Sequence, residues 1–208
     1  MYLLLRLKIL RLELKPGQRI RMDEFCRRLQ VSRTPVREAL LLLAHENLID
    51  LVPQKYTTVS LLCPSRFPDE IFLLESLVCD AVWSIKAKQN DIDVLKQDLR
   101  AQQTDLGNKD YFQFVMDYKT FFSYIFHVIG KEYIWEDGQR HCGHILRLMY
   151  ANLQRKPMAQ EAYQNNLQIL QQIELENKIK ALAVARKFLH GDLVDSSWLQ
   201  NVNSDFFC

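Results

Sequence analysis

Two arginines, Arg33 and Arg37, lie one helical turn apart at the start of a predicted helix, and this spacing suits contact with a nucleic acid. Ser32 and Thr34 can bond the first exposed amides of that helix, and Pro35 is tolerated in a first turn. The positive end of the helix dipole lies at the same place. Guanidinium groups so arranged suit phosphates and guanine edges. When residues 32–37 are considered alone, the alternative to DNA binding is a helix start that is simply exposed to solvent.

The elements that would position these arginines are two short, closely joined helices. The first is predicted at 23–29, with Asp23 as its N-cap, and residues 30–31 form a tight connection. The second is predicted from Ser32 to near Asn47, a residue that tolerates the left-handed conformation. Such a pair is typical of a helix-turn-helix. Apolar residues recur at helical spacing along the second helix at Val36, Ala39, Leu40, Leu43 and Ala44.

The flanking segments complete a small domain. A helix at 2–12 ends at the turn signal Lys15-Pro16-Gly17, and β-prone runs at 48–52 and 57–60 flank a turn. Three helices followed by a two-stranded hairpin predict a winged helix-turn-helix. Residues 1–62 carry 11 Lys/Arg against 6 Asp/Glu, a net charge of +5, whereas residues 63–208 carry −3. The basic part suits a polyanionic partner.

The order and spacing of Lys15-Pro16-Gly17, the run 31–40 (VSRTPVREAL) and Pro53-Gln54 with Val59-Ser60 resemble the GntR family of bacterial winged-helix transcription regulators. The resemblance implies that Arg33 and Arg37 face the major groove of DNA. Lys55-Tyr56 stands where the family usually has glycine at the tip of the wing. The other DNA contacts that the resemblance implies come from Ser32 and Thr34 on phosphate, Arg27 or Arg28 nearby, and Gln54 and Lys55 on the wing.

After a linker at 63–67, residues 68–208 are predicted to be all-helical, with no strand after Ser60. Asp91 and Asp110 are expected N-caps, and Gly130 and Gly138 are possible breaks. The fold class is therefore mainly α, a winged helix-turn-helix followed by an antiparallel bundle. This part resembles the FadR-type subgroup, whose helical FCD domain dimerises and binds an effector. Helices are expected near 68–88, 91–106, 110–129, 132–154, 158–176 and 178–190.

Most FCD domains hold a metal with one Asp and three His. Here Tyr118 and Phe122 occupy the first Asp and His positions, Asn166 the next, and Phe188 or His190 the last. Phenylalanine cannot coordinate a metal, so we predict that the family's metal is absent and that no cofactor is bound. The cavity is expected to hold an apolar or aromatic small molecule, or to be filled as core. Its proposed lining is Tyr118, Phe122, Arg147, Asn166 and His190.

A different metal site among His127, His141, His144 and His190 has weak support, although His141 and His144 are expected on one helix face. Five cysteines without CxxC spacing predict free thiols in a reducing cytosol, with Cys142 buried. The leucine-rich start is too short and too charged to span a membrane. Phosphate-loop, GxSxG and HExxH motifs are absent, which excludes the common enzyme classes they mark.

These observations predict a cytoplasmic transcription regulator, a repressor, that binds a palindromic double-stranded DNA operator as a homodimer. A small-molecule effector in the helical domain would modulate binding. The alternative is a winged helix used for protein contact, with the helical domain as a scaffold. It fits the altered wing, but the charge of residues 1–62 argues against it.

Overall fold

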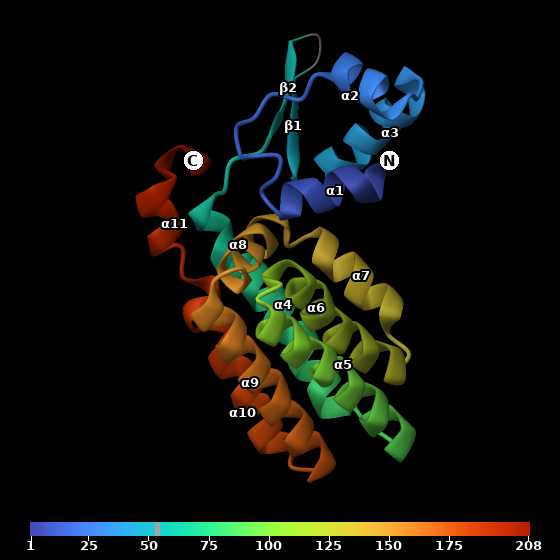
Figure 1. Cartoon of the computed structure of the whole chain (residues 1–208), viewed down its shortest axis with the longest axis vertical. Coiled ribbons are helices and arrows are strands. Elements are labelled where there is room, and N and C mark those ends of the chain that lie inside the picture. The colour runs from blue at the N-terminus through green and yellow to red at the C-terminus, as the bar shows by residue number, and fades with distance from the viewer. Residues whose placement is uncertain (53–54) are drawn as a thin grey trace. The chain divides into compact units, whose positions relative to one another are not determined.

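The computed structural model describes residues 1–52 and 55–208, and for Arg28, Leu29 and Asp192 the backbone alone. The chain divides into two compact units, whose boundary runs through three helices. Unit 1 consists of residues 1–70, 140–147 and 196–208, and unit 2 of residues 71–139 and 148–195. Each unit is described by itself, with the elements labelled in Figure 1.

Unit 1 contains the predicted winged helix-turn-helix. Its helices are α1 (Tyr2–Leu10), α2 (Met22–Leu29) and α3 (Arg33–His45), followed by the strands β1 (Ile49–Val52) and β2 (Tyr56–Val59). The strands are antiparallel, with Ile49 opposite Val59. The fold class predicted from the sequence is therefore confirmed.

The apolar spacing of α3 is the physical basis of this packing. Val36, Ala39, Leu40 and Leu43 are all buried, and the residues between them point to solvent. Two left-handed residues set the turns on either side, Gln30 after α2 and Asn47 after α3, with φ of 52° and 56°. Asn47 was predicted in this role, whereas the use of Gln30 was not.

The helix ends differ from prediction in three places. Ser32 is the N-cap of α3, but its side chain makes no capping bond. Asp23 is not an N-cap, because α2 begins after Arg21 and Asp23 lies in its first turn. The N-cap of α5 is Lys88, and Asp91 instead accepts a bond of 2.7 Å from the Lys88 amide. Asp110 is confirmed as an N-cap, since its side chain accepts a hydrogen bond of 2.9 Å from the Gln113 amide at the start of α6.

A segment before α2 extends the wing. The Ile20 amide donates to the Thr57 carbonyl at 2.8 Å, and the Val59 amide donates to the Gln18 carbonyl at 2.9 Å. Gly17, at φ 77°, makes the predicted turn that brings this segment beside β2. Residues 17–20 are thereby fixed next to the hairpin, a pairing that the sequence did not indicate.

Unit 1 also contains residues 196–208, which lie far from residues 1–70 in the sequence. The short helices η1 (Pro64–Arg66), α11 (Ser197–Val202) and η3 (Ser204–Phe206) belong to it, and Leu62 forms a parallel bridge with Phe207. Cys63 and Cys208 form a disulfide, so the prediction that all five cysteines are free thiols was wrong for this pair. The sequence separation of 145 residues hid the pairing. Cys142 is buried, as predicted.

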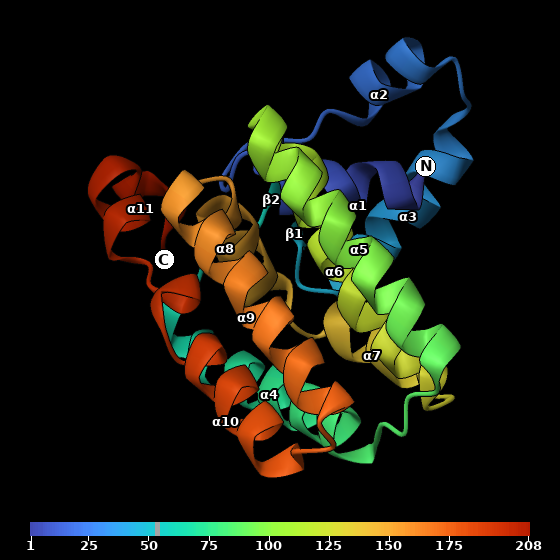
Figure 2. The ribbon, with the colours of Figure 1, turned by 60° about the horizontal axis from the view of Figure 1, so that its bottom comes forward.

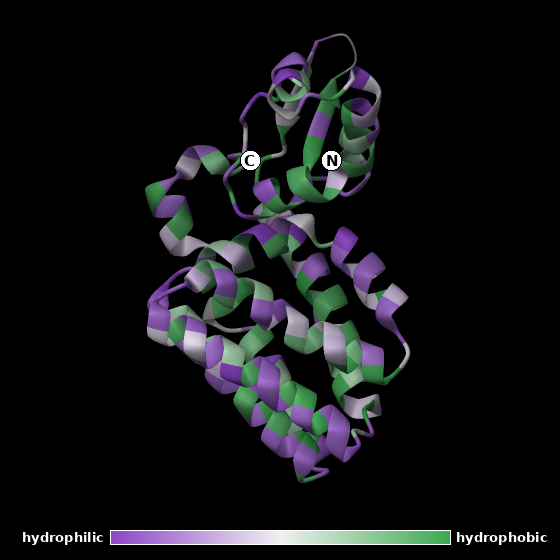
Figure 3. Ribbon diagram, turned by 45° about the vertical axis from the view of Figure 1, so that its right-hand side comes forward, coloured by the Kyte–Doolittle hydropathy of each residue, from purple (hydrophilic) through white to green (hydrophobic). Residues whose placement is uncertain are grey.

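The remaining helices form a bundle, as expected. In Figures 1 and 2, α5 lies beside α6, and α9 beside α10. Figure 3 shows hydrophilic and hydrophobic positions alternating along these helices, which is typical of helices with one buried face. The elements are α4 (Phe67–Ser84), α5 (Gln89–Asn108), α6 (Tyr111–Val128), α7 (Glu132–Arg140), α8 (Gly143–Leu153), α9 (Lys156–Glu174), α10 (Lys178–Leu189) and η2 (Asp192–Val194).

The single helix predicted at 132–154 is in fact α7 and α8, separated at residues 141–142. Gly138 does not break α7, and a Cβ there would lie 2.3 Å from a methyl carbon of Leu77. Gly143 starts α8, where a Cβ would lie 2.9 Å from the Glu46 carbonyl oxygen. The break thus lets the start of α8 approach the end of α3 more closely than a side chain would allow.

Candidate nucleic-acid interface

The two arginines at the start of α3 are exposed, as the prediction requires. Because the apolar face of α3 is buried, Arg33 and Arg37 are left on its outer side. The Arg33 side chain is 74% exposed, and its Nη2 lies 2.7 Å from Oδ1 of Asp23. An ion pair this exposed contributes little to stability, so a phosphate or a base edge can take the place of Asp23.

The other predicted contacts on the helix-turn-helix are also on the surface. Arg27, Ser32 and Thr34 are exposed, and Arg27 Nε donates to the Asp23 carbonyl at 3.4 Å. Ser32 stands in extended backbone just before α3, and its hydroxyl is not used in capping. It therefore keeps a donor and an acceptor for an outside group, next to the positive end of α3.

The wing presents further positive charge. Lys55 and Tyr56 are exposed, and the Lys55 carbonyl accepts a bond of 3.2 Å from Arg19 Nη2. Gln54 lies outside the described residues. Arg19 and Arg21 line the same surface hollow of about 650 Å³ as Arg27 and Lys55.

Sequence reasoning missed Arg19 and Arg21 as interface candidates. They could have been considered, because both contribute to the positive net charge of residues 1–62. Their position beside the wing follows only from the pairing of residues 17–20 with β2.

A buried carboxylate fixes α1 to the end of α3. Glu46 accepts a hydrogen bond from the Tyr2 hydroxyl and pairs with Arg6 Nε at 2.6 Å. Burial, followed by the effect of the Glu46 carboxylate, raises the pKa of Tyr2. The Tyr2 hydroxyl therefore keeps its proton and remains a donor to Glu46 near neutral pH.

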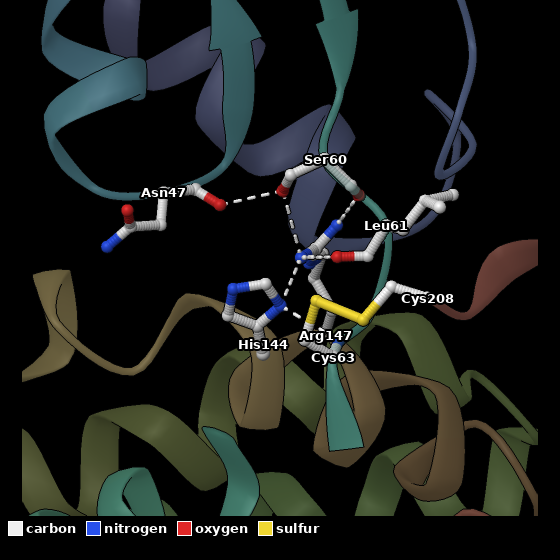
Figure 4. The surroundings of a disulfide bond; sticks show 7 residues. All are labelled: Asn47, Ser60, Leu61, Cys63, His144, Arg147 and Cys208. Atoms are coloured by element: carbon white, nitrogen blue, oxygen red, sulfur yellow. Dashed lines mark hydrogen bonds between the residues drawn. A yellow bond between two sulfur atoms is a disulfide. The ribbon is translucent and has the colours of Figure 1, made fainter. Parts of the chain in front are cut away.

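Arg147 does not line a cavity in the bundle, in contrast to the prediction. It lies in unit 1, fully buried, and binds the chain at the exit of β2 (Figure 4). Its Nη1 donates to the Ser60 carbonyl at 2.6 Å, and its Nη2 lies 3.3 Å from the Leu61 carbonyl. Burial lowers the pKa of Arg147 to about 10, so it stays charged near neutral pH. Its function here is to hold residues 60–61, where the chain leaves β2.

His144 completes this cluster. Its Nδ1 accepts from the Cys63 amide at 3.2 Å and lies 3.1 Å from Arg147 Nη2. Burial, and then the charge of Arg147, lower the pKa of His144 to about 4, so the ring is a neutral acceptor. His141 lies between α7 and α8, so the prediction that it shares a helix face with His144 was wrong.

The other two histidines of the proposed metal site are engaged elsewhere. His127 pairs with Glu132 and His190 with Glu75, at 2.7 and 2.8 Å. Within residues 1–52 and 55–208, no three His, Cys, Asp or Glu side chains are grouped so as to hold a metal.

In unit 2, Tyr118 and Phe122 pack against each other with ring centroids 5.4 Å apart, and Tyr118 lies 6.4 Å from Phe188. Burial raises the pKa of Tyr118 above its usual value. Aromatic rings therefore fill the positions where the resembling domains have metal ligands, and these residues do not fit the metal. His190, which was predicted to join them, is exposed and paired with Glu75.

Asn166 belongs to a buried polar group instead. Its Nδ2 donates to Gln102 Oε1 at 3.3 Å, and Gln102 Nε2 donates to the Asp117 carbonyl at 3.3 Å. Asp98 and Asp105 lie on the same helix as Gln102, at spacings of four and three residues. Burial, and then the charge of Asp117, raise the pKa of both carboxyls to about 6. This group was not found from the sequence.

The raised pKa of Asp105 makes unit 2 sensitive to pH. The usual pKa of an Asp carboxyl is 3.8, so the folded state loses stability as the pH rises from about 4 to about 6. Above pH 6 the destabilisation by the Asp105 charge is fully present. Asp105→Asn is expected to stabilise the protein at pH 8 by about 1–2 kcal/mol, a value discounted for solvent screening. At pH 4 the gain should disappear. Denaturant unfolding at both pH values measures this, with the exposed Asp93→Asn on α5 as control.

Equal gains for Asp105→Asn at pH 4 and pH 8, or a loss at both, would contradict this origin of the effect. The control tests for a general response to one fewer negative charge on α5. Asp93 is exposed, so its replacement should change stability little at either pH.

Comparison with known proteins agrees with the geometry of unit 1. The family described as bacterial regulatory proteins, gntR family, matches residues 1–59. An uncharacterized HTH-type transcriptional regulator of Streptomyces ambofaciens is 38% identical over 109 residues. These residues are 52% of this chain and 45% of that protein, so the match spans less than half of the relative's length.

Two solved structures share the fold of nearly the whole chain. E. coli McbR/YncC has a TM-score of 0.76 at 20% identity, covering 97% of this chain and 96% of that one. A GntR transcriptional regulator structure from Rhodococcus sp. RHA1 has a TM-score of 0.75 at 17% identity, covering 90% and 91%.

Residues 1–59 are therefore a winged helix-turn-helix domain of the DNA-binding type. The model of the gntR family of bacterial regulatory proteins covers this domain. The matching family and relatives are regulators rather than enzymes, in agreement with the expectation from the sequence.

Proposed function

We propose that the whole protein is a transcriptional regulator of the bacterial cytoplasm, a repressor, that binds a palindromic operator as a homodimer. The observation that carries this proposal is the exposed pair Arg33 and Arg37 on α3. Two copies of α3, related by a twofold axis, would read two half-sites about one helical turn apart. Among the described residues, no helix is long and apolar enough to cross a membrane.

The helical bundle is the proposed dimerisation and effector domain, of the FadR-type with an FCD fold. Large apolar side chains on unit 2 support a protein contact there, since Phe72 is 71% and Ile179 is 76% exposed. The effector would be an apolar or aromatic small molecule that reaches the rings of Tyr118 and Phe122. Zinc and nickel analysis of protein purified without chelators tests the proposed loss of the family's metal.

The proposal is tested by selecting duplexes from a random-sequence DNA library with the purified protein. We expect enrichment of an inverted repeat, bound by two protein chains as measured by sedimentation of the complex. Recovery of no preferred sequence at low salt would overturn the proposal. It would leave the protein-contact role of the winged helix, with the bundle as a scaffold, as the better explanation.

Lys55 should contribute a contact that does not depend on base sequence. Lys55→Ala is expected to weaken binding to specific and non-specific duplexes alike and to reduce the salt slope by about one. Binding measured at several salt concentrations shows both effects. Lys131→Ala, which removes one exposed lysine from unit 2, is the control and should leave the slope unchanged. An effect confined to the specific duplex would instead indicate base recognition by Lys55.

A further inference from the structure

The segment that leaves the wing is held at several successive residues within unit 1. Arg147 binds the carbonyls of Ser60 and Leu61. The Leu62 amide donates to the Phe206 carbonyl at 2.8 Å, and the Cys208 amide donates to the Leu62 carbonyl at 3.0 Å. Figure 4 shows the Cys63–Cys208 disulfide beside this guanidinium and the His144 ring. This segment, residues 60–63, is called the linker from here on. It is thus attached both to α8 and to residues 206–208.

These attachments differ in how they can be broken. The Arg147 bonds are buried and persist as long as the guanidinium is charged. Residues 206–208 are attached to Leu62 by the two backbone bonds and the disulfide, and Cys208 is exposed. The Cα atoms of Cys63 and Cys208 are 5.3 Å apart, a normal separation for a disulfide. The bridge is therefore accessible to soluble oxidants and reductants.

We propose that Cys63 and Cys208 form a reversible redox switch, whose disulfide fixes residues 196–208 to the segment that leaves the wing and thereby limits the movement of that segment. Intracellular disulfides are commonly transient and redox-sensing. The inference rests on the proposed function, because the movement that it limits is the one needed to position two recognition helices on an operator.

The chemistry balances with a peroxide as oxidant. The Cys208 thiolate attacks one peroxide oxygen, the O–O bond breaks, and a sulfenic acid forms with release of water after protonation. The Cys63 thiol then attacks that sulfur, the S–O bond breaks, and a second water leaves. Two thiols lose two electrons and one peroxide gains them. A dithiol reductant returns two electrons and two protons and restores both thiols.

The two redox states should differ in the freedom of the linker. In the oxidised protein, backbone amide exchange at Leu62 and Cys208 is expected to be at least about 10-fold slower than in the reduced protein. A fixed linker also tolerates fewer spacings between half-sites. Oxidised protein should therefore lose affinity more steeply, by about 10-fold or more, when two base pairs are inserted between selected half-sites.

The experiment treats the protein of residues 1–208 with peroxide or with dithiothreitol and locates the disulfide by mass spectrometry of peptides. Binding is measured on the library-selected duplex and on its spacing variants. Cys63→Ser should remove the difference between the two treatments. Cys26→Ser, which removes a thiol near α3 that is not in the disulfide, should leave the difference intact.

Three results would overturn the switch: peroxide treatment that leaves Cys63 and Cys208 reduced, equal amide exchange in the two states, or equal spacing tolerance in the two states. If neither state binds any duplex, the proposed function fails, and the switch fails with it as a control of DNA binding. The mass and exchange measurements would still show whether the disulfide forms and fixes the linker.

Discussion

Arg37→Ala is expected to reduce affinity for the selected duplex by about 10- to 100-fold, which corresponds to about 1–3 kcal/mol for a bidentate contact to a base. The same loss is expected for Arg33→Ala. Both side chains are exposed on the outer side of α3, so neither substitution removes a packing contact. Fluorescence anisotropy on specific and scrambled duplexes measures the loss, which should be larger on the specific one.

A matched control for this result is Arg100→Ala, which removes one exposed arginine from α5 in unit 2. It should leave the affinity within about twofold, because Arg100 is not among the predicted DNA contacts and an exposed charge that is not in contact is largely screened by salt. Circular dichroism should show unchanged folding for all three variants. If Arg33→Ala and Arg37→Ala bind the selected duplex as well as the unsubstituted protein, α3 is not the recognition helix.

The largest expected loss of stability follows from removing Arg147. Arg147→Ala would leave the buried Ser60 carbonyl and the partly buried Leu61 carbonyl without their donor and should destabilise unit 1 by about 3–5 kcal/mol. Arg147→Lys keeps a charge but cannot supply donors from two guanidinium nitrogens, so it should recover only part of the loss. Denaturant unfolding of the protein of residues 1–208 measures both variants.

Arg186 provides the comparison for this measurement. It is a mostly exposed arginine that pairs with Glu75 at 3.0 Å. Its replacement by alanine should change the free energy of unfolding by less than about 1 kcal/mol, as is usual for surface ion pairs. A loss for Arg147→Ala no larger than the loss for Arg186→Ala would contradict the role of Arg147 in holding the linker.

The winged helix-turn-helix could be predicted because its signals are local. The period of the apolar residues in α3, the left-handed Asn47 and the turn at Gly17 all act within a few residues. The bundle could be predicted for the same reason. The break at residues 141–142 could not, because it depends on the approach of Gly143 to the Glu46 carbonyl, nearly one hundred residues away.

The exposure of the candidate interface residues was predicted better than the lining of the candidate cavity. Exposed arginines at a helix start follow from the helical period, whereas the surroundings of Arg147 depend on tertiary pairing. An arginine beside apolar residues on α8 gave no sign that Ser60 and Leu61 would be its partners. The Cys63–Cys208 pair escaped prediction in the same way, since spacing says little about cysteines so far apart in sequence.

The composition of unit 1 has a practical consequence for protein engineering. Its three chain segments, 1–70, 140–147 and 196–208, pack as one body. A chimaera that joined residues 1–62 to a foreign sensory module would leave behind Arg147 and the strand partner of Leu62. To exchange this domain between proteins, its discontinuous segments must therefore be moved together, or the surface that they cover must be redesigned.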